Sequence, residues 1–398
     1  MLTHEIQIRH DQQDQYLYVP FTMPPGMARL EVSYTYTGHG EGECVIDLGV
    51  MENDRVRGWT GGARSSFFIA TAKATPGCQP GPLTPGPWAV MLGTYRIPAE
   101  GATGRVTIAM QAAEHRWLKG DLHHHTHHSD GAHSVAEVMK LAEEAGLDFL
   151  ALTDHNTITQ NTVHCESPVL AIPGLEVTTN HGHLNILGAR ELVDFRFRTA
   201  AEFRRPAEGL VVLNHPHCDF CPWEHDFSFD FDLVEVWNGL WTARNERALA
   251  WWQAELAAGR RVPAVGGSDC HRVELFSVIR TGAPTTYVLA ADATVQAILA
   301  GLKAGHVMIS DMHDGPAIWI TPGPGETVAP GSHEVAIRLE RAEDCTLRLI
   351  DRTGIIYEAP AGDTTYVWEA AGGNFLRAEL RSDFTGMVRA LTNPVYVA

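Results

Sequence analysis

The central third of the chain contains short apolar runs that alternate with helix-like segments, and several of these runs end at a histidine or an acidic residue. The residues that follow them are Asp154 and His155 after LDFLALT, Glu176 after AIPGL, His215 after GLVVLN, and Asp269 and His271 after VPAVGG. Alternating strands and helices are typical of a parallel β/α architecture. Because the carboxyl ends of the strands carry the site in β/α barrels, these four coincidences predict one shared cavity.

Capping patterns predict helices between the apolar runs. Ser134 and Glu137 form a capping box before VAEVMKLAEEA, which predicts a helix there. Thr199 with Glu202 predicts the start of a second helix, and Asp292 predicts the start of a third. The centre of the chain is therefore expected to be an α/β domain.

The two flanks of the chain have a different texture. Residues 1–113 alternate β-rich runs such as LEVSYTY and CVIDLGV with Gly/Pro-rich connections, which is typical of a β-sandwich or jelly roll. Residues 314–398 repeat this texture in runs such as HEVAIRLERA and TTYVWEA. The sequence thus predicts an α/β domain over residues 114–313, flanked by β-sandwich-like domains over 1–113 and 314–398. The flanking domains are expected to cover the centre or to mediate self-association into a homo-oligomer.

Composition limits the possible partners. The 398 residues are 44% hydrophobic and carry a net charge of -18, so bulk nucleic acid and anionic membranes would be repelled by the average surface. No stretch of about 18 apolar residues is present, and the N-terminus MLTHEIQIRHDQQ lacks the basic and apolar regions of a signal peptide. We expect a cytoplasmic protein with no membrane partner.

The cysteines do not form a disulfide pattern. They are seven in number and scattered along the chain, so reduced thiols are expected. Cys218 and Cys221 form a C-x-x-C pair directly after NHPH, but no second pair lies nearby. The sequence predicts two buried or surface thiols there and no zinc ribbon.

The strongest local pattern is Asp121-Leu-His-His-His-Thr126. Alternate side chains of an extended segment share a face, so His123 and His125 can point at one ion while His124 points away. A single His-x-His is equally compatible with a structural or surface role. Together with the strand-end residues it predicts a metal site, and imidazole with carboxylate suits zinc, manganese or iron.

Six segments, in their order along the chain, carry a more specific resemblance. DLHHHTHHSDG, LTDHN, GLE, GHLNILG, NHP and SDCH resemble the metal motifs of the PHP (polymerase and histidinol phosphatase) superfamily, over about residues 118–312. The flanking segments RGWTGGARSSF, ATPGCQPGPLTPGPWAVMLGTY and ALTNPVYV resemble the carbaryl hydrolase (CehA/McbA-type) branch of that superfamily.

This resemblance implies an irregular (β/α)7 barrel and nine ligands for two or three divalent ions (Zn²⁺, Mn²⁺ or Fe²⁺). The first ion would be bound by His123, His125, Glu176 and Asp269, the second by Glu176, His183 and His215, and the third by Asp130, His155 and His271. Two positions keep alternatives. His128 could replace Asp130, and His183 is preferred to His181 because GHLNILG matches the family segment.

Other polar residues lie beside the expected ligands in the sequence. Asp154 could accept the free ring N–H of a metal-bound imidazole or simply cap a loop. His217 could protonate a leaving group, and Arg272 could contact an anionic substrate. Glu235 and Asn238 end the run LVEVWN and either face the cavity or serve the turn that follows.

The resemblance implies a metal-dependent hydrolase whose nucleophile is a metal-bound hydroxide. We expect a phosphoesterase acting on a small-molecule phosphodiester or phosphomonoester, because a cluster of ions matches the several oxygens of a phosphate. The branch resemblance gives the alternative of a carbamate or aryl ester hydrolase. A remoter alternative is a non-catalytic binding protein that metals stabilise.

Overall fold

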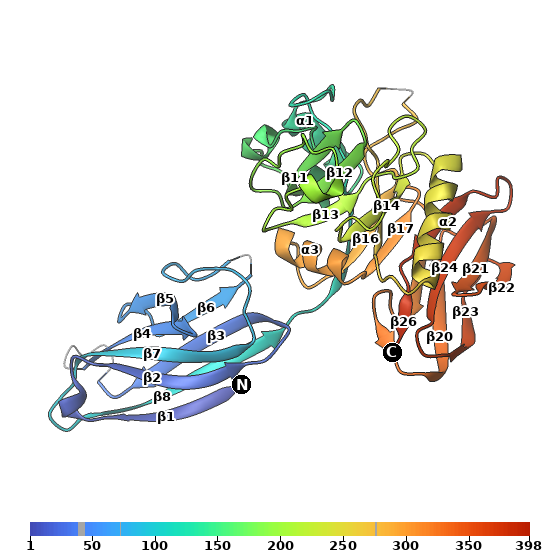
Figure 1. Ribbon diagram of the computed structural model, residues 1–398. Coiled ribbons are helices and arrows are strands. Elements are labelled where there is room, and N and C mark those ends of the chain that lie inside the picture. Colours follow the sequence, from blue (N-terminus) through green and yellow to red (C-terminus); the bar gives the residue numbers. More distant parts are fainter. Residues whose placement is uncertain (39–43, 72, 275–276) are drawn as a thin grey trace. The chain divides into compact units, whose positions relative to one another are not determined.

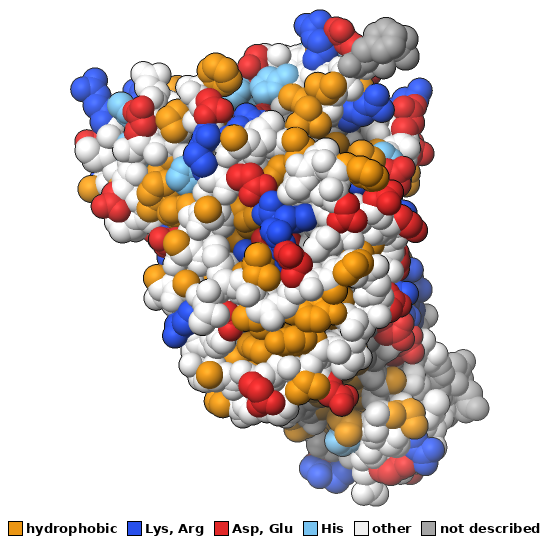
Figure 2. Space-filling model, turned by 90° about the vertical axis from the view of Figure 1, so that its right-hand side faces the viewer, with side chains coloured by type: hydrophobic (Ala, Val, Ile, Leu, Met, Phe, Trp, Pro, Cys, Tyr) orange, Lys and Arg blue, Asp and Glu red, His pale blue; other side chains and the backbone are white. Residues whose placement is uncertain are grey.

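The computed structural model describes residues 1–38, 44–71, 73–274 and 277–398. The chain divides into two compact units, Met1–His115 and Arg116–Ala398, and each is described by itself (Figure 1). No helix in these described ranges is long and apolar enough to cross a membrane. On the face of the molecule in Figure 2, basic, acidic and hydrophobic side chains are interspersed.

The first unit consists of two four-stranded antiparallel sheets (Figure 1). Alternate residues of its strands are buried, and the two sheets share one core in which Leu30 and Val32 of one pack with Ile46 and Leu48 of the other. This is the two-layer β arrangement that the alternating pattern predicts. In sheet order the strands are β1 (Leu2–Ile8), β8 (Ala102–Ala112), β3 (Met27–Tyr36) and β6 (Ser66–Ala70), then β2 (Tyr16–Met23), β7 (Gly86–Arg96), β4 (Val45–Glu52) and β5 (Arg55–Gly61).

The second unit is built on a mixed sheet. Its strands β9, β10 and β11 are parallel, β12 is antiparallel to both its neighbours, and β13, β14 and β15 are again parallel. The sheet curves so that β15 and β16 come together. The hydroxyl of Thr286 in β16 accepts from the backbone N–H of Gly266 in β15 (3.0 Å) and donates to the Gly266 carbonyl (2.7 Å). The strands are β9 (Arg116–Asp121), β10 (Phe149–Leu152), β11 (Leu170–Thr179), β12 (Gly182–Leu187), β13 (Leu210–Leu213), β14 (Leu233–Asn238), β15 (Ala264–Gly267), β16 (Thr285–Ala290) and β17 (Val307–Ser310).

The described residues form three α-helices: α1 (Val135–Glu144), α2 (Ala243–Ala257) and α3 (Val295–Lys303). The capping box before α1 is confirmed, since Ser134 Oγ accepts from Glu137 N and Glu137 Oε2 accepts from Ser134 N. The third predicted helix begins after Thr294, whose hydroxyl accepts from Ala297 N. The helix α2 was not predicted from the sequence. Among the described residues, an α-helix thus follows a strand of the second unit at three points only, at α1, α2 and α3. The irregular (β/α)7 barrel stays a prediction.

The helix predicted from Thr199 and Glu202 was wrong. Only a single 3₁₀ turn, Ala200–Glu202, forms there, and the Thr199 side chain makes no capping bond. Pro206 follows closely, and a proline disfavours helical backbone in the residue before it. The acidic side chain still acts locally, because Glu202 Oε2 accepts from Arg198 N at 2.8 Å.

The last 80 residues continue the central sheet. β25 (Val388–Thr392) pairs antiparallel with β17, and the sheet extends through β24 (Phe375–Ser382), β21 (Cys345–Asp351) and β22 (Gly354–Pro360). A three-stranded sheet of β18 (Ala317–Thr321), β20 (Gly331–Glu340) and β23 (Thr364–Ala370) packs against it, and the short strands β19 (Thr327–Val328) and β26 (Val395–Val397) pair with each other. The division into three domains at 113 and 313 stays a prediction.

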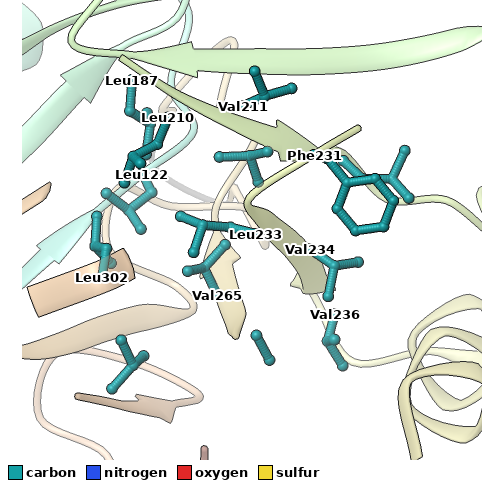
Figure 3. Packing of buried hydrophobic residues seen from close by; sticks show 14 of the residues in the cluster. Leu122, Leu187, Leu210, Val211, Phe231, Leu233, Val234, Val236, Val265 and Leu302 are labelled. Carbon is teal, nitrogen blue, oxygen red and sulfur yellow. The ribbon is translucent and has the colours of Figure 1, made fainter. Parts of the chain in front are cut away.

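A large apolar core anchors the strand ends of the second unit (Figure 3). Val234 and Val236 of β14 and Val265 of β15 are buried in it, as is Leu122, which follows β9. Glu235 lies between the two valines, so strand alternation points it to the opposite face. The core thereby fixes the positions from which the polar side chains of the site project.

Candidate metal centre

The His-x-His segment projects two rings in one direction. The ring centroids of His123 and His125 are 5.2 Å apart, and both side chains are buried. His124 points elsewhere, with Nε2 3.0 Å from Thr281 Oγ1. This is the arrangement expected of an extended segment, and it leaves two imidazoles side by side at the end of β9.

Glu176 of β11 lies at the middle of the histidines. Its side chain is almost fully buried, and both carboxylate oxygens face imidazole nitrogens. Oε1 lies 3.0 to 3.5 Å from nitrogens of His183, His123 and His215, and Oε2 lies 2.8 Å from His155 and 3.4 Å from His125. A carboxylate whose two oxygens face separate sets of ligands has the geometry needed to bridge two ions.

Asp269 completes the group around the His-x-His segment. Its Oδ1 lies 3.1 Å from His125 Nε2 and 3.4 Å from His123 Nε2. Its backbone N–H donates to the carbonyl of His123 at 2.8 Å, which ties the end of β15 to the end of β9. Asp269 (φ 52°) and His215 (φ 27°) both adopt positive φ, a strained conformation for residues other than glycine that costs about 1–3 kcal/mol and often occurs at functional sites.

A third group opens toward solvent. Asp130 Oδ1 lies 3.2 Å from His271 Nε2 and 3.6 Å from His155 Nε2, and the rings of His271 and His125 stack at 4.0 Å. The side chains of Asp130 and His271 are 59% and 34% exposed, whereas those of His123, His125 and Glu176 are at most 1% exposed. The cluster is therefore reached from the side of Asp130 and His271.

The two alternative histidines lie differently from the preferred ones. His128 Nδ1 lies 2.9 Å from Thr159 Oγ1, away from this group. His181 pairs with Glu224 at 2.9 Å, while His183 faces Glu176. The contacts thus favour Asp130 and His183.

Four sets of possible metal donors occur among the described residues, each with its donor atoms within 4.8 Å of one another. Every one of the nine predicted ligands belongs to at least one set, and Cys221 is an unpredicted addition. The sets are His123, His125 and Asp269; His123, Glu176 and His215; His125, Asp130, His155 and His271; and His183, His215 and Cys221. That these side chains bind metal ions stays a prediction.

The donor atoms fit divalent cations. Within the described chain, the buried Nε2 atoms of His123 and His125 have no hydrogen-bond partner. Leaving a buried polar atom unpaired costs about 1–3 kcal/mol, and a cation between the rings would remove that cost. Imidazole and carboxylate donors suit zinc, manganese or iron.

The charges of the cluster compensate one another. Burial alone would raise the pKa of Glu176, but the neighbouring histidines, His123 foremost, hold it well below its usual value. The pKa of Asp269 is likewise well below its usual value, because His123 and His125 outweigh the effect of burial. Burial would lower the pKa of His123, yet Asp269, Glu235 and Glu176 raise it well above the ordinary range. His123 and the ionised carboxylates thus stabilise one another, and a cation would take over the role of the histidine charge.

Comparisons with known proteins found three similarities. Residues 121–207 match the family model of the PHP domain. The uncharacterized protein MJ1587 of Methanocaldococcus jannaschii is 29% identical over 140 residues. The alignment covers 30% of this chain and 82% of that protein. A crystal structure from Bacteroides vulgatus, titled a two-domain protein containing a predicted PHP-like metal-dependent phosphoesterase, is 17% identical with a TM-score of 0.40, covering 71% of this chain and 96% of that one.

Further side chains hold the candidate ligands in place. Glu235 Oε1 lies 2.9 Å from His123 Nδ1, and its Oε2 accepts from His215 N and from Asn238 Nδ2. Asn238 Nδ2 also lies 3.2 Å from Asp269 Oδ2. Their position at the end of β14 had indicated Glu235 and Asn238 as residues that could face the cavity. No sequence pattern indicated Asn214, whose Nδ2 donates to Glu176 Oε1 at 2.9 Å.

Replacing Glu235 with glutamine is expected to weaken metal binding by about 10–100-fold, the usual effect of removing a partner that orients a ligand histidine. The amide keeps the size of the side chain but can no longer accept from both His123 and His215 as a carboxylate does. Competition with a chromogenic chelator measures the change, and Glu224→Gln, at the exposed pair with His181, is the matched control. An unchanged affinity in Glu235→Gln would contradict the orienting role.

The three residues predicted to act in catalysis have different surroundings. Both carboxylate oxygens of Asp154 accept from the loop of Thr126 and Ser129, at 2.7 to 2.8 Å, so the loop-capping alternative describes it. His155 Nδ1 instead lies 2.5 Å from Thr178 Oγ1. A catalytic role of Asp154 stays a prediction.

His217 and Arg272 each adjoin candidate ligands in the sequence, but their side chains contact other residues. The His217 ring packs against Phe227 and Trp251, and burial, together with Arg247, lowers its pKa. Because the neutral ring is favoured at neutral pH, these surroundings argue against a protonated His217 as general acid. Arg272 is exposed and its Nη1 lies 3.1 Å from Glu274 Oε1, so its contact with substrate stays a prediction.

Proposed function

We propose that this protein is a metal-dependent hydrolase that cleaves phosphoesters, either monoesters or diesters. The observation that carries the proposal is the cluster of imidazoles and carboxylates around Glu176, with its deepest donors buried and one side open. Structural zinc sites are usually closed, four-coordinate and often rich in cysteine. An open cluster with many N/O donors is better suited to binding a substrate.

The proposed ligand sets follow the three donor groups. One ion would be bound by His123, His125 and Asp269, and a second by His183 and His215. Glu176 would be shared by these two ions. A third ion would be bound by His155, His271 and Asp130. Bound divalent ions lower the pKa of water and stabilise negative charge that develops on substrate oxygens. The curled mixed sheet also supports the irregular (β/α)7 barrel implied by the sequence resemblance.

The chain's own contribution is to position these groups. Glu235 fixes the ring of His123, and Thr178 fixes the ring of His155, which determines the nitrogen that each presents. Asn214 and Asn238 hold the carboxylates of Glu176 and Asp269. Substrate would approach past Asp130 and His271, the most exposed members of the cluster.

Phosphoesters are preferred to carbamates on chemical grounds. Several ions side by side match the several oxygens of a phosphoryl group better than the one carbonyl oxygen of a carbamate. Arg272 is expected to contact an anionic substrate. The resemblance of the flanking segments to the carbaryl hydrolase branch keeps carbamate or aryl ester hydrolysis as the second candidate.

The test is hydrolysis of a phosphomonoester, a phosphodiester and an aryl N-methylcarbamate by the full chain reconstituted with zinc or manganese. We expect phosphoester turnover that falls by about 10²-fold or more in His123→Ala, because an ion that stabilises the transition state loses a ligand. Arg272→Ala should lower phosphoester turnover more than any carbamate turnover. Cleavage of the carbamate alone would favour the second candidate, and bound metal without any cleavage would favour a non-catalytic binding protein.

A further inference from the structure

Cys221 lies beside two of the candidate ligands. Its Sγ is 3.8 Å from His215 Nδ1, and His183, His215 and Cys221 form a set whose donor atoms all lie within 4.8 Å of one another. Within the described ranges no other cysteine belongs to such a set. From the sequence, Cys221 was predicted only to be a free thiol.

The spacing of these donors suits one ion. Zinc binds an imidazole nitrogen at about 2.0–2.1 Å and a thiolate sulfur at about 2.3 Å, so two such ligands in a tetrahedron lie roughly 3.6 Å apart. The observed 3.8 Å between His215 Nδ1 and Cys221 Sγ is close to that separation. An ion between these two atoms would lie on the Nδ1 side of His215, whereas Nε2 of the same ring faces Glu176 Oε1 at 3.5 Å.

The chain after β13 holds the sulfur in this position. Cys218 N donates to the carbonyl of His215 at 2.9 Å, and Trp223 N donates to the carbonyl of Pro216 at 3.0 Å, so the segment between folds back on itself. The Sγ atoms of Cys218 and Cys221 lie 3.1 Å apart. Cys221 Sγ thus donates to Cys218 Sγ, and this contact keeps the Cys221 sulfur beside the histidines.

The surroundings of Cys218 connect it to the rest of the centre. Arg244 Nη1 lies 3.9 Å from Cys218 Sγ, and Arg244 Nη2 donates to Asn238 Oδ1 at 2.8 Å. Asn238 in turn holds Asp269. The guanidinium brings a positive charge close to the sulfur of Cys218.

We propose that Cys221 binds a divalent ion on the Nδ1 side of His215, with His183 as a further candidate ligand, and that this position therefore selects zinc over manganese. Soft thiolate ligands favour zinc, whereas manganese prefers oxygen donors. The inference rests on the proposed metal site but not on the identity of the substrate. It makes the centre a mixed one, with a thiolate at one ion and nitrogen and oxygen donors at the others.

Cobalt substitution of the full chain tests this assignment, because a thiolate bound to Co²⁺ gives a charge-transfer band in the near ultraviolet. We expect the band in the wild-type protein and in Cys165→Ser, which removes a cysteine outside the four donor sets, and its loss in Cys221→Ser. Competition experiments should show that Cys221→Ser lowers the preference for zinc over manganese by about tenfold or more, at least the effect of losing an outer partner.

The wild-type spectrum alone can overturn the proposal, so the result does not depend on whether a variant folds. Cobalt bound without a charge-transfer band would mean that Cys221 only hydrogen-bonds His215. In that case the proposed hydrolase function would still stand. A protein that binds no cobalt, zinc or manganese would contradict both this inference and the proposed function. A band that persists in Cys221→Ser would assign the thiolate to another cysteine and overturn the proposal.

Discussion

Replacing Glu176 with alanine is expected to lower the metal content of the protein and to reduce hydrolysis by about 10³-fold or more. The two carboxylate oxygens face five histidines, so no other described side chain contacts as many members of the cluster. A metal ion can supply several kcal/mol of transition-state stabilisation, and each ~1.4 kcal/mol is a tenfold change in rate. Metal analysis of the purified protein and turnover of the best substrate measure the two effects.

The matched control is Glu143→Ala, which removes an exposed carboxylate from α1. It should leave metal content and turnover unchanged. Full metal content in Glu176→Ala would show that the separate histidine groups bind ions without a shared carboxylate, and would contradict the bridging role.

The gathering of several candidate ligands in one place could be predicted from the sequence because their positions follow from local rules, although that they bind metal stays a prediction. Glu176 lies in β11 beyond the stretch that pairs with β10, and Asp269 follows β15, so the two come together although 93 positions separate them in the numbering. Alternation along an extended segment correctly separated His124 from His123 and His125. The two-layer β unit at the N-terminus followed from the same period of two.

Features that depend on distant contacts were not predicted. Cys221 reaches the centre only because the chain after His215 folds back, and a C-x-x-C spacing does not reveal that. The aromatic surroundings of His217 come from Phe227 and from Trp251 of α2, a helix that the sequence pattern did not indicate. The pairing of β25 with β17 likewise joins strands about 80 residues apart, which composition alone cannot show.

Asp121 hydrogen-bonds the backbone beside two candidate ligands. No function was predicted for it from the sequence. The residue is fully buried, and its carboxylate accepts from three backbone N–H groups in separate segments. Oδ1 accepts from His123 at 3.2 Å and Ser268 at 2.9 Å, and Oδ2 accepts from Gly282 at 2.9 Å. His123 is itself a candidate ligand, and Ser268 directly precedes Asp269.

Asp121→Ala is therefore expected to lower the free energy of unfolding by about 3 kcal/mol or more, since each buried N–H left unpaired costs about 1–3 kcal/mol. That is a large share of the ~5–15 kcal/mol that stabilises a typical protein. Urea unfolding of the metal-free protein measures the loss.

Asp148→Asn is the matched control, because Asp148 Oδ2 accepts from a single backbone N–H, that of Lys119, on the same strand. Asp121→Asn should give an intermediate loss, as its amide retains one acceptor oxygen. If Asp121→Ala unfolds at the same urea concentration as the wild-type chain, these three hydrogen bonds do not determine the stability of the centre, and the ends of β9 and β15 must be held together by the apolar core beneath them.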